Sequence, residues 1–64
     1  MKVNGKEVEF KNNTNIIDLL NNYNLNKDRV VVEINFNIID ENEYEDYIIN
    51  NKDVIEVINF VGGG

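Results

Sequence analysis

The sequence predicts an α+β domain in which one main helix packs on one face of a β-sheet. Three observations predict this fold class: an Asn-Gly turn between two short alternating segments, one apolar stripe at helical spacing, and later extended segments rich in Val and Ile. With 64 residues and no proline, the chain has the length of one small domain. The predicted element order is β-β-α-β-β-short α-β.

The first element is a hairpin around Asn4-Gly5. Asn-Gly is the preferred two-residue hairpin turn, because a type I′ turn needs positive φ at both central positions. Residues 1–3 and 6–10 are the expected strands. Val8 and Phe10 alternate with charged residues, which predicts a second strand with one solvated face.

A helix is predicted from residue 16 to about residue 23. Its apolar residues fall at the i, i+3, i+4, i+7 spacing of an amphipathic helix: Ile16, Leu19, Leu20 and Tyr23. Asn15 is a suitable N-cap, and Asp18 follows three residues later, as in a capping box.

The second half of the chain contains three further extended segments. Residues 30–34 predict a strand with Val30, Val32 and Ile34 pointing inward, and residues 36–39 predict a second, shorter one. The acidic segment 40–46 leads into a short helix or 3₁₀ turn suggested by Tyr44, Tyr47 and Ile48. Residues 50–53 form a turn, and residues 54–61 form the last strand.

The composition excludes several classes of function. The chain has no Cys, His or Ser, so the usual nucleophile–base pairs cannot form, and Thr14 is the only hydroxyl nucleophile besides tyrosine. The net charge is −6, which disfavours nucleic-acid binding because that requires Lys and Arg on phosphates. No apolar run is long enough for a membrane helix or a signal peptide. We therefore expect a cytoplasmic protein that is not an enzyme and needs no cofactor.

The last predicted strand is apolar on both faces. Glu56 marks one face as solvated, yet Ile58 and Phe60 share that face by alternation. A chain this short can hardly cover both faces of a sheet. Exposed Ile58 and Phe60 would suit an interface with a partner protein.

The chain closes with Gly62, Gly63 and Gly64. Glycine has no Cβ, so such an end can thread a narrow channel and leaves its terminal carbonyl uncrowded. The Gly64 α-carboxylate has a pKa near ~3.5, so it is an anion and a poor electrophile until it is activated, for example as an acyl-adenylate. A cloning scar or a flexible linker is the alternative explanation.

The chain as a whole resembles the thiamine-biosynthesis sulfur carrier (ThiS) family. The resemblance lies in VNGKEVEF, NIIDLL, RVVVEIN, KDVIEVINFV and the terminal GGG. It implies a ubiquitin-like β-grasp fold, with the last strand parallel to the first in the centre of a mixed sheet. Residues 1–61 would form the β-grasp domain, and residues 62–64 a flexible C-terminal glycine tail. Many members have glycine where this chain has Phe36 or Asn37, and a proline where it has Asp40-Glu41.

The resemblance also implies a function. The family is adenylated on its last glycine by a ThiF-like enzyme, then receives sulfur as a C-terminal thiocarboxylate, and passes that sulfur to thiazole synthase. Carried over, Gly64 is the modified residue and Gly63 its required neighbour, while Ile58, Phe60, Val61 and Gly62 would contact partners. The expected partners are the adenylating enzyme, thiazole synthase and a sulfur donor protein.

Two alternatives stay open from the sequence. The terminal Gly-Gly is shared with the small subunit of molybdopterin synthase, so a sulfur carrier for that pathway is the nearer alternative. A non-catalytic acidic β-grasp module that binds a basic protein is the other. The acids of residues 40–46 lack the spacing and central glycine of a calcium loop, so we expect a solvated surface and no metal site.

Overall fold

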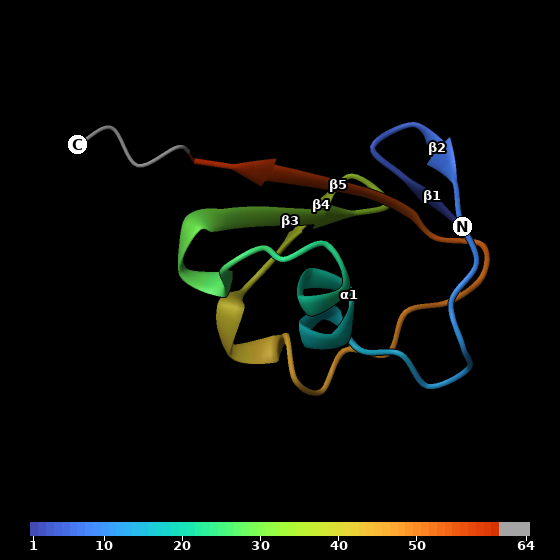
Figure 1. Ribbon diagram of the computed structural model, residues 1–64, viewed down its shortest axis with the longest axis horizontal. Coiled ribbons are helices and arrows are strands. Elements are labelled where there is room, and N and C mark those ends of the chain that lie inside the picture. Colours follow the sequence, from blue (N-terminus) through green and yellow to red (C-terminus); the bar gives the residue numbers. More distant parts are fainter. Residues whose placement is uncertain (61–64) are drawn as a thin grey trace.

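The computed structural model describes residues 1–60 (Figure 1). Its elements are β1 (Lys2–Val3), β2 (Lys6–Glu7), α1 (Ile16–Asn22), β3 (Val30–Ile34), β4 (Asn37–Ile39) and β5 (Val54–Asn59), with 3₁₀ helices at Lys27–Arg29 and Glu41–Glu43. The sheet order is β2-β1-β5-β3-β4. β5 is parallel to β1 and antiparallel to β3, so the predicted mixed sheet with a central last strand is confirmed.

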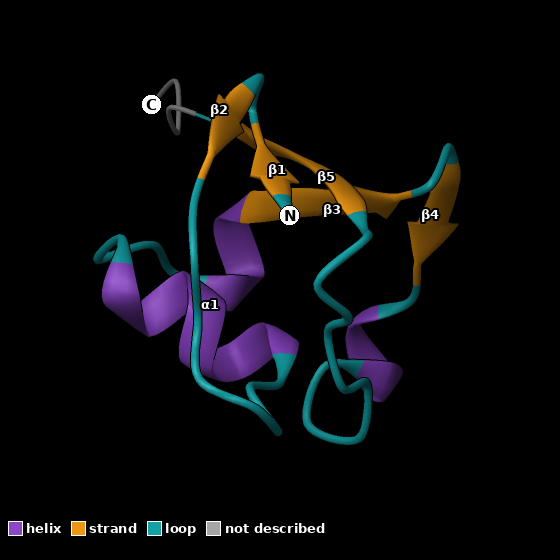
Figure 2. Ribbon diagram, turned by 90° about the vertical axis from the view of Figure 1, so that its right-hand side faces the viewer, coloured by secondary structure: helices purple, strands orange, loops and turns teal. Residues whose placement is uncertain are grey.

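α1 covers one face of the sheet and leaves the opposite face open (Figure 2). The helix begins as predicted: the Asn15 side chain accepts from the Asp18 N–H at 2.8 Å, and the Asp18 carboxylate accepts from the Asn15 N–H at 3.3 Å. This capping box satisfies backbone donors that the first turn leaves free. Tyr23, predicted to be in the helix, is its C-cap.

The core lies between α1 and the covered face of the sheet. It consists of Val3, Ile16, Leu19, Leu20, Val30, Val32, Ile34, Ile39, Tyr44, Ile49 and Ile55. The inward set predicted for residues 30–34 is confirmed, because alternate residues of β3 are buried. Burial of this apolar set is the main stabilising contribution for a sheet covered on one side.

The first hairpin forms at the predicted turn, but its second strand is shorter than predicted. Asn4 and Gly5 have φ of 50° and 84°, as a type I′ turn requires. Pairing continues one residue past β2, where the Val8 N–H donates to the Met1 carbonyl at 3.0 Å. The chain then leaves the sheet, and the Phe10 ring packs edge-on against Tyr23, with ring centroids 6.4 Å apart.

The second hairpin differs from its prediction at Phe36. This residue was expected to begin a strand, but it occupies the turn with φ of 71°, next to Asn35 with φ of 51°. The register pairs Ile34 with Asn37, so the loop has two residues and both have positive φ. Phe36 is 85% exposed.

Three further elements differ from the prediction. The short helix near Tyr44 is a 3₁₀ helix that begins earlier, at Glu41, and leaves Tyr44 buried as its C-cap. The 3₁₀ helix Lys27–Arg29 was not predicted. β5 ends at Asn59 within the described part of the chain. None of the helices within residues 1–60 is long and apolar enough to span a membrane.

Candidate functional site: the end of the central strand

β5 presents its two faces to different surroundings. Ile55 lies on the covered face and is fully buried, whereas Ile58 and Phe60 on the open face are 53% and 56% exposed. The predicted exposure of these two side chains is therefore confirmed. Their side chains contribute little to the core and remain accessible to another protein.

The open face around Ile58 is both apolar and acidic. Ile58 lies opposite Val31 of β3, and Glu56 lies opposite Glu33. Ile38 of β4 lies opposite Glu33 across the β3–β4 pairing and is 73% exposed. Like charges directly across a sheet repel each other, so a basic group flanked by apolar surface would complement this face.

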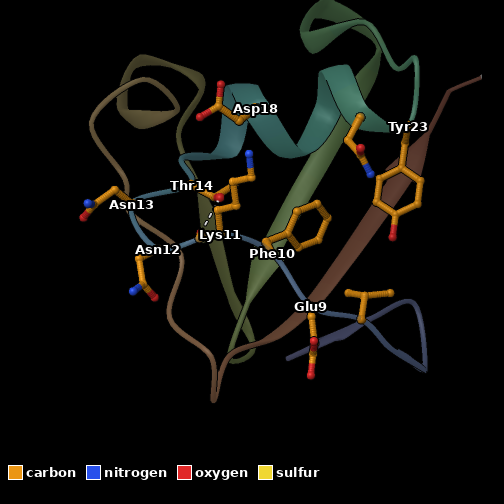
Figure 3. A pocket seen from close by; sticks show the side chains of 10 residues that line it. Glu9, Phe10, Lys11, Asn12, Asn13, Thr14, Asp18 and Tyr23 are labelled. Atoms are coloured by element: carbon orange, nitrogen blue, oxygen red, sulfur yellow. Dashed lines mark hydrogen bonds between the residues drawn. The ribbon is translucent and has the colours of Figure 1, made fainter.

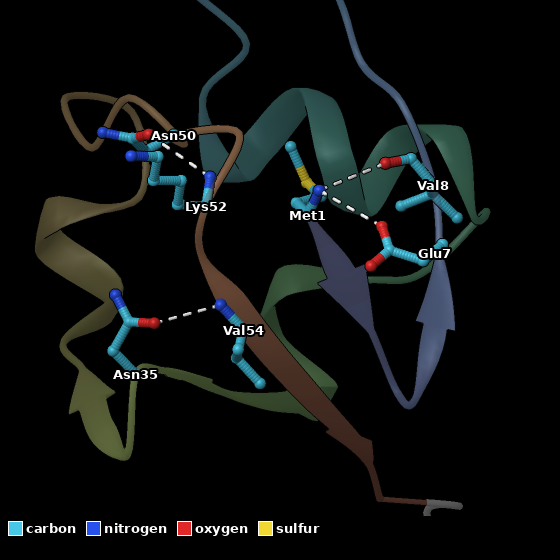
Figure 4. A network of polar contacts seen from close by, with 7 residues as sticks. All are labelled: Met1, Glu7, Val8, Asn35, Asn50, Lys52 and Val54. Carbon is cyan, nitrogen blue, oxygen red and sulfur yellow. Dashed lines mark hydrogen bonds and ion pairs between the residues drawn. The ribbon is translucent and has the colours of Figure 1, made fainter.

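The ion pairing found elsewhere does not relieve this charge. Within residues 1–60 the only ion pair joins the Met1 ammonium to Glu7 at 3.7 Å, and the same ammonium faces the Val8 carbonyl (Figure 4). Neither Glu33 nor Glu56 forms an ion pair within the described residues, so both side chains are available to a partner on the open face.

Two asparagine side chains fix β5 from opposite sides. On the β1 side, Asn4 Oδ1 accepts from the Val57 N–H at 2.8 Å, and Asn4 Nδ2 donates to the Val57 carbonyl at 3.4 Å. At the start of β5, Asn35 Oδ1 accepts from the Val54 N–H at 3.0 Å (Figure 4), and Asn35 Nδ2 donates to Asp53 Oδ1 at 2.9 Å. Neither of these side-chain interactions was predicted from the sequence.

The 3₁₀ helix Lys27–Arg29 supports the last described residue. Asn26 caps this helix by accepting from the Asp28 N–H at 2.9 Å. The Arg29 carbonyl then accepts from the Phe60 N–H at 2.7 Å, so pairing with the β3 side continues past the end of β5. The remaining predicted site residues, Val61, Gly62, Gly63 and Gly64, lie outside the described residues.

One large hollow among residues 1–60 contains no catalytic pair. It has a volume of about 700 Å³ and lies between residues 8–13 and α1 (Figure 3). Thr14 lines it, but this residue is buried and its hydroxyl donates to the Lys11 carbonyl at 2.6 Å. The hydroxyl therefore has a structural role, and the hollow offers no activated nucleophile.

The acidic segment 40–46 is a capped turn in the structure. Asp40 Oδ1 accepts from the Asn42 N–H at 3.1 Å, which caps the 3₁₀ helix. Within residues 1–60, no three Asp or Glu residues are grouped to hold a metal ion. Burial raises the pKa of Tyr44, and burial together with the nearby charges of Asp53 and Glu43 raises the pKa of Tyr47.

The whole chain matches a known family and known proteins. The ThiS family model matches residues 1–64. The sulfur carrier protein ThiS of Bacillus subtilis is 43% identical over 65 residues, covering all of this chain and 98% of that protein. The crystal structure of ThiS from Geobacter metallireducens superimposes with a TM-score of 0.77 at 26% identity, over 98% of this chain and 96% of that one. A thiazole synthase of Paramagnetospirillum magneticum is 31% identical over 62 residues, which are 97% of this chain and 19% of that protein.

Proposed function

This chain belongs to the ThiS family, and we propose that it carries sulfur as a thiocarboxylate on Gly64. It is a sulfur carrier of thiamine biosynthesis and not itself a catalyst. The observation that carries the proposal is the family match over residues 1–64, which includes the three terminal glycines. The composition supports it, because sulfur bound to a main-chain carbonyl needs no cysteine in the carrier.

The chemistry requires two steps at the Gly64 carboxyl group. A carboxylate oxygen attacks the α-phosphorus of ATP, a P–O bond forms and pyrophosphate leaves. Hydrosulfide, or its equivalent from a donor, then attacks the carbonyl carbon, a C–S bond forms and AMP leaves with the oxygen. Activation is needed because the free carboxylate, with a pKa near ~3.5, is an anion at neutral pH and resists nucleophiles.

Within this proposal, the domain and the tail have separate tasks. Residues 1–61 would act as the domain that partners recognise, and residues 62–64 as the tail that reaches an active site. Ile58 and Phe60, together with Val61 and Gly62, contact the partner, while Gly63 and Gly64 enter its channel because they lack a Cβ. The exposure of Ile58 and Phe60 supports this assignment.

Carriers of this family work with an adenylating enzyme and a thiazole synthase. We infer that this chain uses a ThiF-like enzyme, a sulfur donor protein and thiazole synthase. The Paramagnetospirillum thiazole synthase supports the last partner, because a segment similar to this chain occupies part of the same polypeptide. Affinity capture should return thiazole synthase; capture of the large molybdopterin synthase subunit instead would favour the other pathway.

Intact-mass measurement tests the proposed chemistry. The chain is incubated with ATP, sulfide and a ThiF-like enzyme that is active on the Bacillus subtilis carrier. We expect the mass to rise by the difference between sulfur and oxygen, and we expect no rise in a variant that lacks Gly63 and Gly64. No gain in the full chain would contradict the thiocarboxylate, and a deletion variant that keeps its biological activity would favour a plain binding module.

A further inference from the structure

The backbone of β5 bonds alternately to its two neighbours. The main-chain N–H and C=O groups of even-numbered residues point toward β3. The Phe60 N–H donates to the Arg29 carbonyl, and the Val54 carbonyl accepts from the Asn35 N–H at 2.8 Å. The main-chain groups of odd-numbered residues therefore point toward the β1 side, where the Ile55 carbonyl accepts from the Asn4 N–H at 2.9 Å.

This alternation points the main-chain N–H and C=O of Asn59 toward the β1 side. β1 ends at Val3, and the Asn4 carboxamide takes the place of one further strand residue by bonding to Val57. Within residues 1–60, nothing bonds to the main chain of Asn59 on that side. A donor and an acceptor of the central strand are thus open at the end that leads to the glycines.

A hollow of about 250 Å³ reaches Val57, two residues before Asn59 along β5. Four apolar residues line it, with Asn4 and Lys6: Val3, Tyr23, Leu25 and Val57. A strand added beside Asn59 would point alternate side chains the same way as Val57. One of those side chains would face this hollow, which suits an apolar residue.

We propose that an extended segment of the adenylating enzyme pairs with the main chain of Asn59 as an added strand and places an apolar side chain in this hollow. The inference rests on the proposed function. Glycines have no side chains, so an enzyme can hold Gly62–Gly64 only through their main chain. Five residues span at most ~17 Å, so an enzyme acting on Gly64 must lie close to Asn59. Strand addition supplies the matching donor and acceptor.

A proline substitution isolates the proposed main-chain bond. Asn59→Pro removes an N–H that faces the open edge and no bond that holds β5 to β3, and proline is tolerated where the N–H of a strand faces solvent. We expect a folded protein whose ATP–pyrophosphate exchange with the ThiF-like enzyme is reduced about tenfold at subsaturating carrier, as the loss of one well-made hydrogen bond predicts.

Asn51→Pro is the matched control. Asn51 is the second residue of a turn in which the Asp53 N–H donates to the Asn50 carbonyl, a position that favours proline. We expect exchange at the wild-type rate. If Asn59→Pro does not fold, a synthetic chain with an ester in place of the Ile58–Asn59 amide removes the same N–H without a ring, and the same tenfold loss is expected.

Several results would overturn the inference. Normal exchange by the folded proline variant or by the ester chain would do so. An equal loss in Asn59→Ala, which keeps the N–H, would assign the effect to the side chain. Normal exchange with slow sulfur transfer to thiazole synthase would show that the named occupant is wrong. If the wild-type chain supports no exchange with an enzyme active on the Bacillus subtilis carrier, the proposed adenylation itself fails.

Discussion

The two hairpins of this protein use the same turn with different residues at its second position. Both turns begin with an asparagine at positive φ, Asn4 and Asn35, and both asparagines bond through their side chains to the backbone of β5. The second residue is Gly5 in the first hairpin and Phe36 in the second. Both turns hold the central strand through an asparagine side chain, whereas only the second turn has a conformational cost from a non-glycine residue at its second position.

The largest effect is expected from Asn35→Ala. This change removes bonds to the Val54 N–H and to the Asp53 carboxylate, and Asp53 is buried. It also leaves alanine at a φ that only glycine adopts freely. We expect the free energy of unfolding to fall by about 3 kcal/mol in urea titrations followed by circular dichroism. Asn35→Gly should recover the backbone part of that loss, about 1 kcal/mol.

Asn4→Ala should lower the free energy of unfolding by less than Asn35→Ala does, about 2 kcal/mol, because the bonds from Asn4 to Val57 are exposed to solvent. The same urea titration measures it. A cost above that of Asn35→Ala would reverse the ranking of the two hairpins. It would indicate that the β1 side contributes more than the β3 side to holding β5.

Exchanging the second turn residues tests the conformational cost directly. Phe36→Gly should stabilise the fold by about 1 kcal/mol, because a non-glycine residue at φ of 71° is strained. Gly5→Ala should destabilise it by about the same amount; a Cβ built at Gly5 meets nothing within 4 Å, so the cost is conformational alone. No gain in melting temperature for Phe36→Gly would mean that the ring has compensating contacts.

The smallest effect concerns Tyr44, which anchors the chain leaving the second hairpin. Its pKa is raised above 10.0, chiefly by burial. Below the pKa that Tyr44 has in the unfolded state, its hydroxyl is protonated in both the folded and the unfolded state. The contribution of this group to folding stability is therefore complete there. Above pH 10.0 the unfolded state ionises first, so stability should decline as pH rises. Tyr44→Phe should show a shallower decline in pH-dependent melting; identical slopes would contradict the assignment.

The two hairpins also mark the limit of the sequence analysis. The first turn was predictable because Asn-Gly determines its conformation locally. The second was not, because Asn35 is held by Asp53, which lies 18 residues away, and Phe36 follows into an unfavourable φ. Tertiary contacts there override local preference.

The same limit applies to the candidate site. Exposure of Ile58 and Phe60 followed from alternation along one strand and the small size of the domain. The open main chain of Asn59 could not be predicted, because it depends on where β1 ends and on the Asn4 side chain beside it. A pattern of apolar residues identifies faces of a strand, whereas its free backbone groups depend on its neighbours.

The central position of β5 has a mechanical consequence. Phe60 continues a strand that is bonded to β3 along one edge and to β1 and Asn4 along the other. A force applied along the strand at this end loads those hydrogen bonds together in shear, whereas an outermost strand could be peeled away one bond at a time. An enzyme pulling on the terminal residues would therefore meet a firm anchor, and the domain could be drawn in and released without unravelling.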